Sequence, residues 1–460
     1  MRVRPLAVLL AAGLAVGCQP QAAPQPRLAL RWENPDERTW RFTLDPAARF
    51  SDGEPLRASD VKASFARARS LAGSDIAGLL RLVESVETVD EHTVDVRTER
   101  PVALLADLSW VLIARESRAV VPGLPGPLPL GTGPFRLTRF EEGRGLRLEP
   151  NPHHARRSAW SAVDLRVATG EAFGATLERE RPDLGLFFTY AEMERLRARR
   201  PSGLRLEQSE GLFVVYLALN LRERLPGAPQ RNPLSDARVR QALSLATDRQ
   251  AVARDGLGGT ARPARQMVVP AVFGYDASAP PLAEHAQRAR ELLASAGFPG
   301  GLEIELLRST RGSGRIEGAL TRAWKDAGIR ARERFVEDPS GEAEAGRFQA
   351  VVQGFACSTG DAGEALGYLL HSRRGTEWGS FNYGGYGPPE LDRMIEGSLA
   401  VFDPRERLEL MRLALRRAAE DLPVLPLVAR DDVYVVSDRV RLVTRPDGMI
   451  RFPEVAPVAP

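Results

Sequence analysis

The side chains that most often perform catalysis lie scattered along this chain of 460 residues. Among its five histidines only His153 and His154 are adjacent, and no carboxylate stands near them at the spacing of metal ligands. A solvated turn after Pro152 is the favoured interpretation of this pair. Ser313 lies in a glycine-flanked loop, without the strand-to-helix elbow of a serine nucleophile. We therefore expect no enzyme, no catalytic residues, and no bound metal or other cofactor.

The N-terminus has the composition of a secretory signal. Two arginines precede an apolar run from Leu6 to Val16 that is too short to span a bilayer. A small residue directly before Cys18 resembles the lipobox of bacterial lipoproteins, in which the cysteine is acylated. An ordinary secretory signal that contains a cysteine is the alternative. We expect a lipoprotein signal peptide at 1–17, lipidation of Cys18, and a flexible tether at 18–27.

The composition narrows the classes of protein. Cys18 and Cys357 are the two cysteines, so acylation of the first leaves no disulfide framework and no cysteine-based metal site. Cys357 is expected to be a buried structural residue, with a reactive thiol as the alternative. The formal charge of +3 falls to +1 when Arg2 and Arg4 leave with the signal, so nothing indicates a nucleic acid partner.

The pattern of apolar residues predicts alternating strands and helices. Trp40–Leu44 alternates like a half-buried strand, and the apolar run Phe213–Leu219 is typical of a central strand. The second half is predicted to hold strands at 302–307, 330–336, 348–352, 424–428 and 433–436, and helices at 282–296 and 315–327. Gly297 and Gly328 are expected to end these helices, and Asp403 to cap another. The alternation predicts an α/β fold, with candidate domain boundaries at the proline- and glycine-rich joints 122–134 and 226–233.

Several segments, in the same order along the chain, resemble the family 5 extracellular solute-binding proteins, which are the substrate receptors of ABC peptide importers. Trp40–Arg69 resembles a signature of that family, with a strand, a turn at Asp52-Gly53 and a capped helix. Gly131–Phe135 resembles its GTGPY turn, and Tyr216–Asn220 resembles the strand that enters its second lobe. The resemblance extends over residues 28 to 445 and is specific because so many segments are collinear.

The resemblance implies an α/β, two-lobed periplasmic-binding-protein-like fold of type II, cluster C-like, with a hinge and a ligand cleft between the lobes. It implies lobe I at 28–220, with 51–130 as an inserted subdomain. Lobe II is implied at 221–423, and a segment that returns to lobe I at 424–460.

The function that the resemblance implies is that of an extracytoplasmic substrate-binding lipoprotein of an ABC importer. Such a protein captures a peptide or peptide-like small molecule in the cleft and delivers it to transmembrane permease subunits. We expect a monomer, anchored to a membrane by its lipid in the periplasm or at the cell surface. The alternative is a degenerate family member that acts as a surface interaction or sensory lipoprotein without import.

Two departures from the family bear on these expectations. An opening strand and helix precede the family segment that begins here at Arg27, so the first lobe is expected to be shortened at its N-terminus, with one strand edge uncovered. The family's peptide receptors also carry a W-x-x-D-Y motif whose aspartate pairs with the peptide ammonium. Here Ser358 stands at the position of that acid. Because a hydroxyl alone leaves a buried ammonium unpaired, a neutral polar ligand, a blocked peptide or a sugar-like molecule is plausible.

The candidate ligand-binding residues come from this motif and from a glycine-rich aromatic loop. Phe355, Ser358 and Asp361 come first, with core packing as the alternative for Phe355 and helix capping as the alternative for Asp361. The loop at 378–386 adds four residues, because aromatic side chains on a loop suit ligand recognition, although packing is an equal alternative. These four are Trp378, Asn382, Tyr383 and Tyr386.

Overall fold

The computed structural model of the protein describes residues 27–70, 75–116, 129–168, 172–186, 190–199, 202–227, 230–375 and 378–458. The predicted signal peptide, Cys18 and most of the predicted tether lie outside these residues, as does most of the joint at 122–134.

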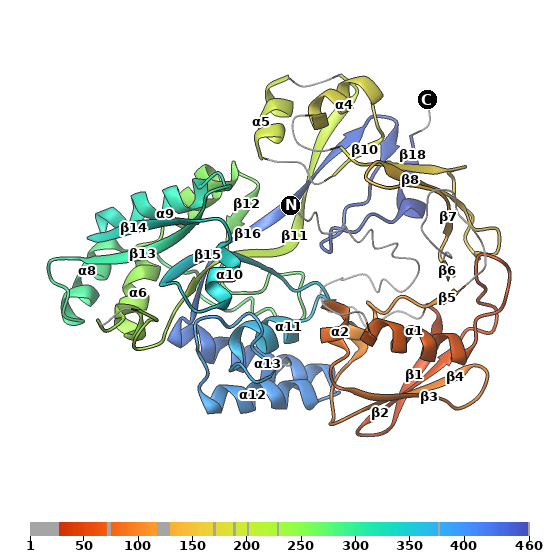
Figure 1. Cartoon of the computed structure of the whole chain (residues 1–460), viewed down its shortest axis with the longest axis horizontal. Helices are drawn as coiled ribbons and strands as arrows, with labels where there is room; N and C mark the ends of the chain where they lie inside the picture. The colour runs from red at the N-terminus through yellow and green to blue at the C-terminus, as the bar shows by residue number, and fades with distance from the viewer. Residues whose placement is uncertain are drawn as a thin grey trace.

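The polypeptide forms two lobes that are joined by two long strands (Figure 1). The main sheet of the first lobe has four antiparallel strands in the order β1-β2-β4-β3. These are β1 (Ala29–Asp36), β2 (Thr39–Leu44), β3 (Val83–Thr88) and β4 (Thr93–Thr98). Helix α1 (Ala58–Ser70) buries Val61, Phe65 and Ala68. The strand predicted at Trp40–Leu44 is therefore confirmed as β2.

The other elements of the first lobe are short. They are α2 (Asp75–Leu79), α3 (Leu105–Leu108), β5 (Ala114–Glu116), β6 (Pro129–Gly131), β7 (Phe135–Glu141), β8 (Gly145–Pro150), β9 (Val163–Arg166), α4 (Ala172–Glu180), β10 (Leu184–Gly185), α5 (Tyr190–Arg199), β17 (Val440–Arg441), η4 (Phe452–Glu454) and β18 (Ala456–Pro457).

The second lobe has the predicted α/β character. Its strands are β12 (Ala261–Pro263), β13 (Leu302–Ser309), β14 (Ile329–Val336) and β15 (Ala350–Ala356). Strand β13 pairs in parallel with both β14 and β15, which requires crossover connections. The helices are η1 (Pro233–Ser235), α6 (Ala237–Leu245), α7 (Arg249–Ala251), η2 (Val252–Gly256), α8 (Ala286–Ser295), α9 (Arg315–Asp326), α10 (Pro339–Glu344), α11 (Gly363–Ala365), η3 (Leu366–Leu370), α12 (Pro389–Ala400) and α13 (Pro404–Asp421).

The two long strands are β11 (Leu204–Leu219) and β16 (Val424–Ser437), which pair antiparallel from Leu204↔Ser437 to Ala218↔Val424. A bulge interrupts their register between Glu210 and Phe213. Beyond the bulge Leu217 and Leu425 lie in the core of the second lobe, whereas Val435 packs with helices of the first lobe. Both strands therefore run through both lobes, as Figure 1 also shows.

The prediction of two separate strands at 424–428 and 433–436 was wrong, because β16 is continuous through the charged residues between them. Arg430 lies 4.3 Å over the ring of Phe213, and Asp431 pairs with Arg262 at 3.0 Å. Residues from other segments thus stabilise the polar side chains within the strand. The local sequence does not show these partners, so it could not predict that the strand continues.

The predicted helix signals mostly hold. The Asp403 carboxylate accepts hydrogen bonds from the amides of Arg405 and Glu406 at the start of α13. Gly297 and Gly328 follow α8 and α9 with φ of +97° and +77°, the region that favours glycine. Helix α8 begins at Ala286 rather than at 282, because the His285 side chain caps it by accepting from the Arg288 amide.

One strand edge of the first lobe is uncovered among the described residues. The stretch Leu204–Glu210 of β11 pairs with β16 on one side and with no described strand on the other. The short β10 pairs with β16 at the same end of the sheet. The shortened first lobe stays a prediction.

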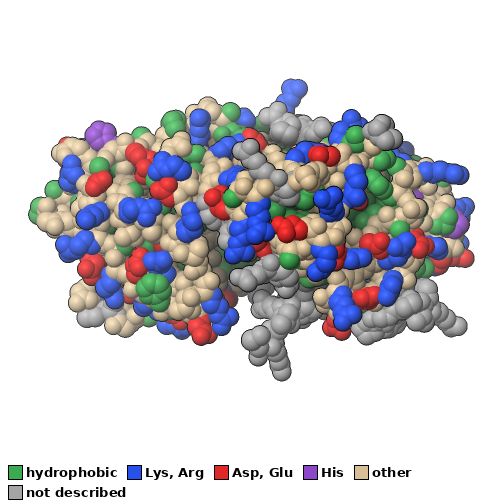
Figure 2. All heavy atoms as spheres, turned by 90° about the horizontal axis from the view of Figure 1, so that it is seen from above, with side chains coloured by type: hydrophobic (Ala, Val, Ile, Leu, Met, Phe, Trp, Pro, Cys, Tyr) green, Lys and Arg blue, Asp and Glu red, His purple; other side chains and the backbone are tan. Residues whose placement is uncertain are grey.

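The face of the molecule seen from above carries interspersed basic and acidic side chains (Figure 2). Exposed ion pairs occur among the described residues, such as Arg147 with Asp164 at 2.9 Å. Such pairs contribute little to stability individually, so we regard this face as a solvated surface.

Candidate functional site

The two lobes contact each other along a seam between α2, α3 and residues 100–104 on one side and η3, α12 and α13 on the other. The amide of Ala103 donates to the carbonyl of Leu399 at 2.9 Å. The ring of Trp40 meets the ring of Phe402 edge-on, with centroids 5.3 Å apart. One continuous apolar cluster includes residues from both sides. We call this contact the interlobe seam.

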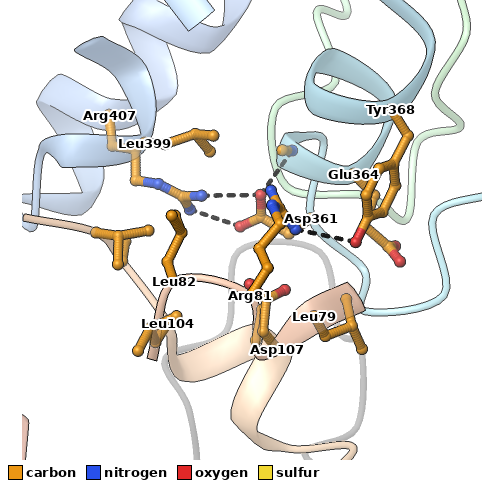
Figure 3. Close-up of a pocket in the computed structure, with 14 residues that line it drawn as sticks. Leu79, Arg81, Leu82, Leu104, Asp107, Asp361, Glu364, Tyr368, Leu399 and Arg407 are labelled. Carbon is orange, nitrogen blue, oxygen red and sulfur yellow. Dashed lines mark hydrogen bonds and ion pairs between the residues drawn. The ribbon is translucent and has the colours of Figure 1, made fainter. Parts of the chain in front are cut away.

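A small pocket opens within the interlobe seam (Figure 3). Its apolar walls include Leu79, Leu82 and Leu104 from the first lobe and Leu399 from the second. Its polar lining comes from both lobes as well. The charged and hydroxyl side chains are Arg81, Asp107, Asp361, Glu364, Tyr368 and Arg407.

Asp361 is committed to an internal ion pair. Its two carboxylate oxygens accept from both terminal nitrogens of Arg407, at 2.5 and 2.9 Å, and both side chains are about 10% exposed. Oδ1 also accepts from the amide of Gly363 at 2.8 Å. A two-pronged pair of this kind satisfies both charges in a desolvated place. Asp361 therefore ties the turn before α11 to helix α13, and its contact with a ligand stays a prediction.

Glu364 and Asp107 face the pocket without an ion pair among the described residues. Glu364 Oε2 accepts from the amide and the hydroxyl of Thr359, at 2.9 and 3.0 Å. Burial raises the pKa of Glu364 to about 8, and the nearby Asp107 adds to the shift. Burial likewise raises the pKa of Asp107 to about 7, although Arg81 opposes that shift. Both carboxyl groups are surrounded by protein yet keep part of their surface open to the pocket.

Arg81 crosses the interlobe seam. Its Nη1 donates to the hydroxyl of Tyr368 at 3.0 Å and to the carbonyl of Gly78 at 3.0 Å. The guanidinium lies 5.1 Å from the ring of Tyr368 and 5.2 Å from that of Trp378. Figure 3 shows it reaching from the first lobe toward the second. Arg81 thus makes polar contact between the lobes.

A cluster of aromatic rings continues from Tyr368 along the second lobe. Phe381 stands at its centre, with ring centroids 5.8 Å from Phe355, 6.2 Å from Tyr368 and 6.1 Å from Tyr383, each in an edge-on arrangement. Phe381 is 41% exposed, unusually open for a large apolar side chain, whereas Phe355 is buried beneath it. The cluster offers an apolar surface on which a ligand can pack.

The predicted residues divide into two groups in the structure. Phe355 and Tyr383 belong to the aromatic cluster, and Ser358 lies exposed on the turn after β15. Trp378 is buried and stacks on His371 at 4.2 Å. Asn382 is also buried.

The partners of Asn382 and Tyr386 are internal. Asn382 Nδ2 donates to the carbonyls of His371 and Tyr386, at 2.8 and 2.5 Å. The Tyr386 hydroxyl donates to Asp421 at 2.9 Å. These two side chains hold the loop in place, and contact of either with a ligand stays a prediction.

Sequence reasoning did not single out Arg81, Asp107, Glu364, Tyr368 or Phe381. Phe381 lies inside the predicted loop at 378–386, and Glu364 lies three residues after Asp361 of the motif. Both residues are therefore close in sequence to predicted site residues. Arg81 and Tyr368 are 287 residues apart, and no local pattern connects them.

The described residues contain no group of three side chains that could hold a metal ion. In that same part of the chain, no helix is both long and apolar enough to cross a membrane. Cys357 is buried, as the sequence predicts.

Comparison with known proteins identifies the class. Residues 23–377 match the sequence model of the bacterial extracellular solute-binding proteins, family 5. The chain belongs to this family, so it is a two-lobed solute-binding protein.

Individual relatives are distant. The chain is 26% identical to the dipeptide-binding protein of Escherichia coli (strain K12), over 89% of this chain and 81% of that protein. It is 25% identical to the glutathione-binding protein GsiB of Salmonella typhi, over 85% and 78%. The solved structure of HbpA2 from Haemophilus parasuis is similar in fold, with a TM-score of 0.80 and 22% identity, over 97% of this chain and 94% of that one. The resemblance found in the sequence and the predicted two-lobed fold are thus confirmed.

Proposed function

We propose that this protein captures a peptide or peptide-like small molecule between its lobes and delivers it to the permease of an ABC importer. The observation that carries the proposal is the interlobe seam, where a part-exposed aromatic cluster adjoins a pocket lined by charged groups from both lobes. Apolar walls with a few converging polar groups are typical of small-molecule sites. Two relatives are named for binding a dipeptide and glutathione, which are both peptide-like.

The proposed mechanism is closure of the lobes on the ligand. A ligand that touches both lobes binds the closed arrangement more tightly and shifts the population toward it. The lobe boundaries that we propose, after 220 and after 423, lie beside the end of β11 and the start of β16. We place the flexing point inside these strands, at the bulge beside Gly211, because the register breaks there.

Membrane attachment completes the proposal. Lipidation of Cys18 would hold the receptor beside its permease in the periplasm or at the cell surface, with the tether at 18–27 allowing it to reach. The receptor is proposed to work as a monomer.

The test is a thermal-shift screen of the soluble form that starts at Gln19, against di- to pentapeptides, N-blocked peptides, sugars and metal chelates. A ligand that binds only the folded state adds about 2.7 kcal/mol of stability at a hundredfold excess over its Kd. A peptide-dependent rise in Tm supports the proposal. A folded sample that responds to none of these compounds would instead favour a surface interaction lipoprotein without import.

A further inference from the structure

The ring of Trp378 is the place where the second lobe receives two guanidinium groups from the first. Cζ of Arg100 lies 4.9 Å from the centroid of this ring, and Cζ of Arg81 lies 5.2 Å from it. A cation this close to an indole is attracted by the negative charge of the ring face. Both arginines belong to the first lobe, on its side of the interlobe seam, so Trp378 makes cation–π contacts between the lobes.

Arg100 has no competing partner among the described residues. Arg81 also donates to the hydroxyl of Tyr368 and to the carbonyl of Gly78. The half-buried guanidinium of Arg100, in contrast, makes no ion pair or side-chain hydrogen bond in that part of the chain, and its partner is the ring of Trp378. Because a guanidinium is planar and weakly hydrated, it stacks on an aromatic face more readily than an ammonium group does. The contact with Trp378 is therefore the interaction that places Arg100.

Trp378 is held firmly within its own lobe. Its ring stacks on that of His371, with centroids 4.2 Å apart and planes 19° apart. His371 is itself fully buried, and its Nδ1 contacts the carbonyl of Ser372 at 2.8 Å. The backbone of Trp378 is fixed as well, because its amide donates to the carbonyl of Arg374 at 3.3 Å and its carbonyl accepts from the amide of Arg374 at 3.2 Å. The ring thus stands ready in one orientation, and little side-chain freedom is lost when the arginines reach it.

Two glycines leave room for this arrangement. A Cβ atom at Gly367 would lie 3.3 Å from Cζ3 of Trp378 and 3.7 Å from Nη2 of Arg81. A Cβ atom at Gly379, where φ is +64°, would lie 2.7 Å from the carbonyl oxygen of His371. The backbone around Trp378 therefore accommodates both the indole and the guanidinium.

We propose that Arg100 and Trp378 form a clasp between the lobes, which favours the closed arrangement and so positions the two halves of the site for capture. This inference rests on the proposed function and specifies how its closure is controlled. Because the contact requires that the lobes meet, its loss should shift the population toward separated lobes. For a partly desolvated cation–π contact we expect a shift of about fivefold. The apparent affinity for a ligand that needs closed lobes should fall by up to the same factor.

Interlobe distances in the ligand-free protein test the clasp. Spin labels at the exposed positions Glu87→Cys in β3 and Glu303→Cys in β13 report on the two lobes of the soluble form that starts at Gln19. Arg100→Met keeps a long apolar side chain and removes the charge, so the ratio of long to short distances should rise about fivefold. Arg100→Lys keeps a cation at the ring but loses the planar group, so its distances should lie between those of the natural protein and Arg100→Met.

A matched variant controls for the loss of a surface charge. Arg97→Met removes an exposed arginine of the same lobe, whose contact with Glu84 is 3.5 Å long. Its distance distribution should equal that of the natural protein. Thermal unfolding verifies that each variant is folded, and we expect little change in Tm because neither arginine is fully buried.

A second measurement follows the ring of Trp378 itself. Incorporation of 5-fluorotryptophan gives each of the six tryptophans a fluorine NMR signal, and Trp378→Phe identifies the signal of Trp378. This signal should move in Arg100→Met, because the guanidinium over the ring is lost. It should stay in place in Arg97→Met.

A larger share of long distances in Arg100→Met but not in Arg97→Met, together with a displaced Trp378 signal, would support the clasp. Unchanged distances in Arg100→Met, or an unmoved Trp378 signal, would overturn it. Lobes that separate as far in Arg100→Lys as in Arg100→Met would overturn it too, because the charge would then have no part. None of these results requires a ligand, so the clasp can fail while peptide capture stands. Failure of peptide capture would instead appear in the thermal-shift screen and would leave these distances unaltered.

Discussion

At the scale of single residues, the motif near 355–364 shows what local sequence predicts and what it leaves open. Phe355 could be predicted as a candidate because it lies in a recognisable strand and turn, and the structure places its ring 5.8 Å from that of Phe381. Its contact with a ligand stays a prediction. The partner of Asp361 could not be assigned, because Arg407 belongs to a helix 46 residues further on. No sequence pattern indicated Arg81 or Asp107, because they become part of a pocket only where the two lobes meet.

The Asp361–Arg407 pair is expected to support stability rather than ligand contact. Asp361→Asn leaves the Arg407 charge buried and unpaired, so we expect a loss of about 3–5 kcal/mol in the free energy of unfolding. The control Asp164→Asn breaks the exposed pair with Arg147 and should cost less than about 1 kcal/mol. Denaturant titration of both variants checks this, and equal small losses would contradict the role given to Asp361.

The raised pKa values of Asp107 and Glu364 predict a pH dependence of stability. The folded state holds these protons more tightly than the unfolded chain, whose carboxyl groups titrate near their usual pKa of about 4. Stability should therefore be highest below that pKa range, and it should fall as pH rises toward about 7 for Asp107 and about 8 for Glu364.

Unfolding measured at several pH values compares the natural protein with the double variant Asp107→Asn, Glu364→Gln. The variant should lose less stability between pH 5.5 and 8, with a difference in slope of at most about 1.4 kcal/mol per pH unit for each proton. Parallel curves would show that these carboxyl groups are not buried as described.

At the scale of elements, most strands and helices were predictable because their apolar periodicity and caps are local. The long strands were not, since the charged stretch of β16 is stabilised by Phe213 and Arg262 from other elements. The first half of β11, Leu204–Glu210, was not predicted either, because it lacks the continuous apolar run that marks the second half. The bulge that separates the two halves has no marker in the sequence apart from Gly211.

Gly211 is expected to be essential to the bulge. A Cβ there would lie 2.8 Å from the carbonyl oxygen of Arg430 and 3.1 Å from the Asp432 carboxylate, so Gly211→Ala forces the paired strands apart. We expect a loss of about 1–3 kcal/mol in stability. Gly397→Ala is the control, because that exposed position in α12 has open space and should gain about 0.5–1 kcal/mol. Thermal unfolding compares them, and a neutral Gly211→Ala would contradict the tight bulge.

At the scale of the whole molecule, the family and the two-lobed architecture could be predicted from many collinear segments. The geometry of the interlobe seam could not be predicted, because it depends on contacts between segments that are far apart in the sequence. Its contacts combine apolar packing, one backbone hydrogen bond and the Arg81–Tyr368 contact. These interactions are available to set the balance between open and closed lobes.

Tyr368→Phe tests the polar contact across the seam while the ring stays in the aromatic cluster. Loss of the hydroxyl removes the acceptor that Arg81 has in the second lobe, worth about 1 kcal/mol, so ligand affinity should fall about fivefold with little change in Tm. Tyr434→Phe is the control, since that buried hydroxyl has no hydrogen-bond partner in the described structure and lies outside the seam. An unchanged ligand affinity in Tyr368→Phe would contradict a role of the Arg81–Tyr368 hydrogen bond in closure of the lobes.

The most direct test of ligand capture between lobes is the interlobe distance with and without ligand. Spin labels on cysteines at the exposed positions Glu87 in β3 and Glu303 in β13 report on the two lobes, while the buried Cys357 stays unlabelled. We predict that a mixture of di- to pentapeptides shifts the distance distribution and narrows it toward a single closed arrangement. A distribution that is identical with and without the peptides, in a protein shown to be folded, would contradict peptide capture by lobe closure.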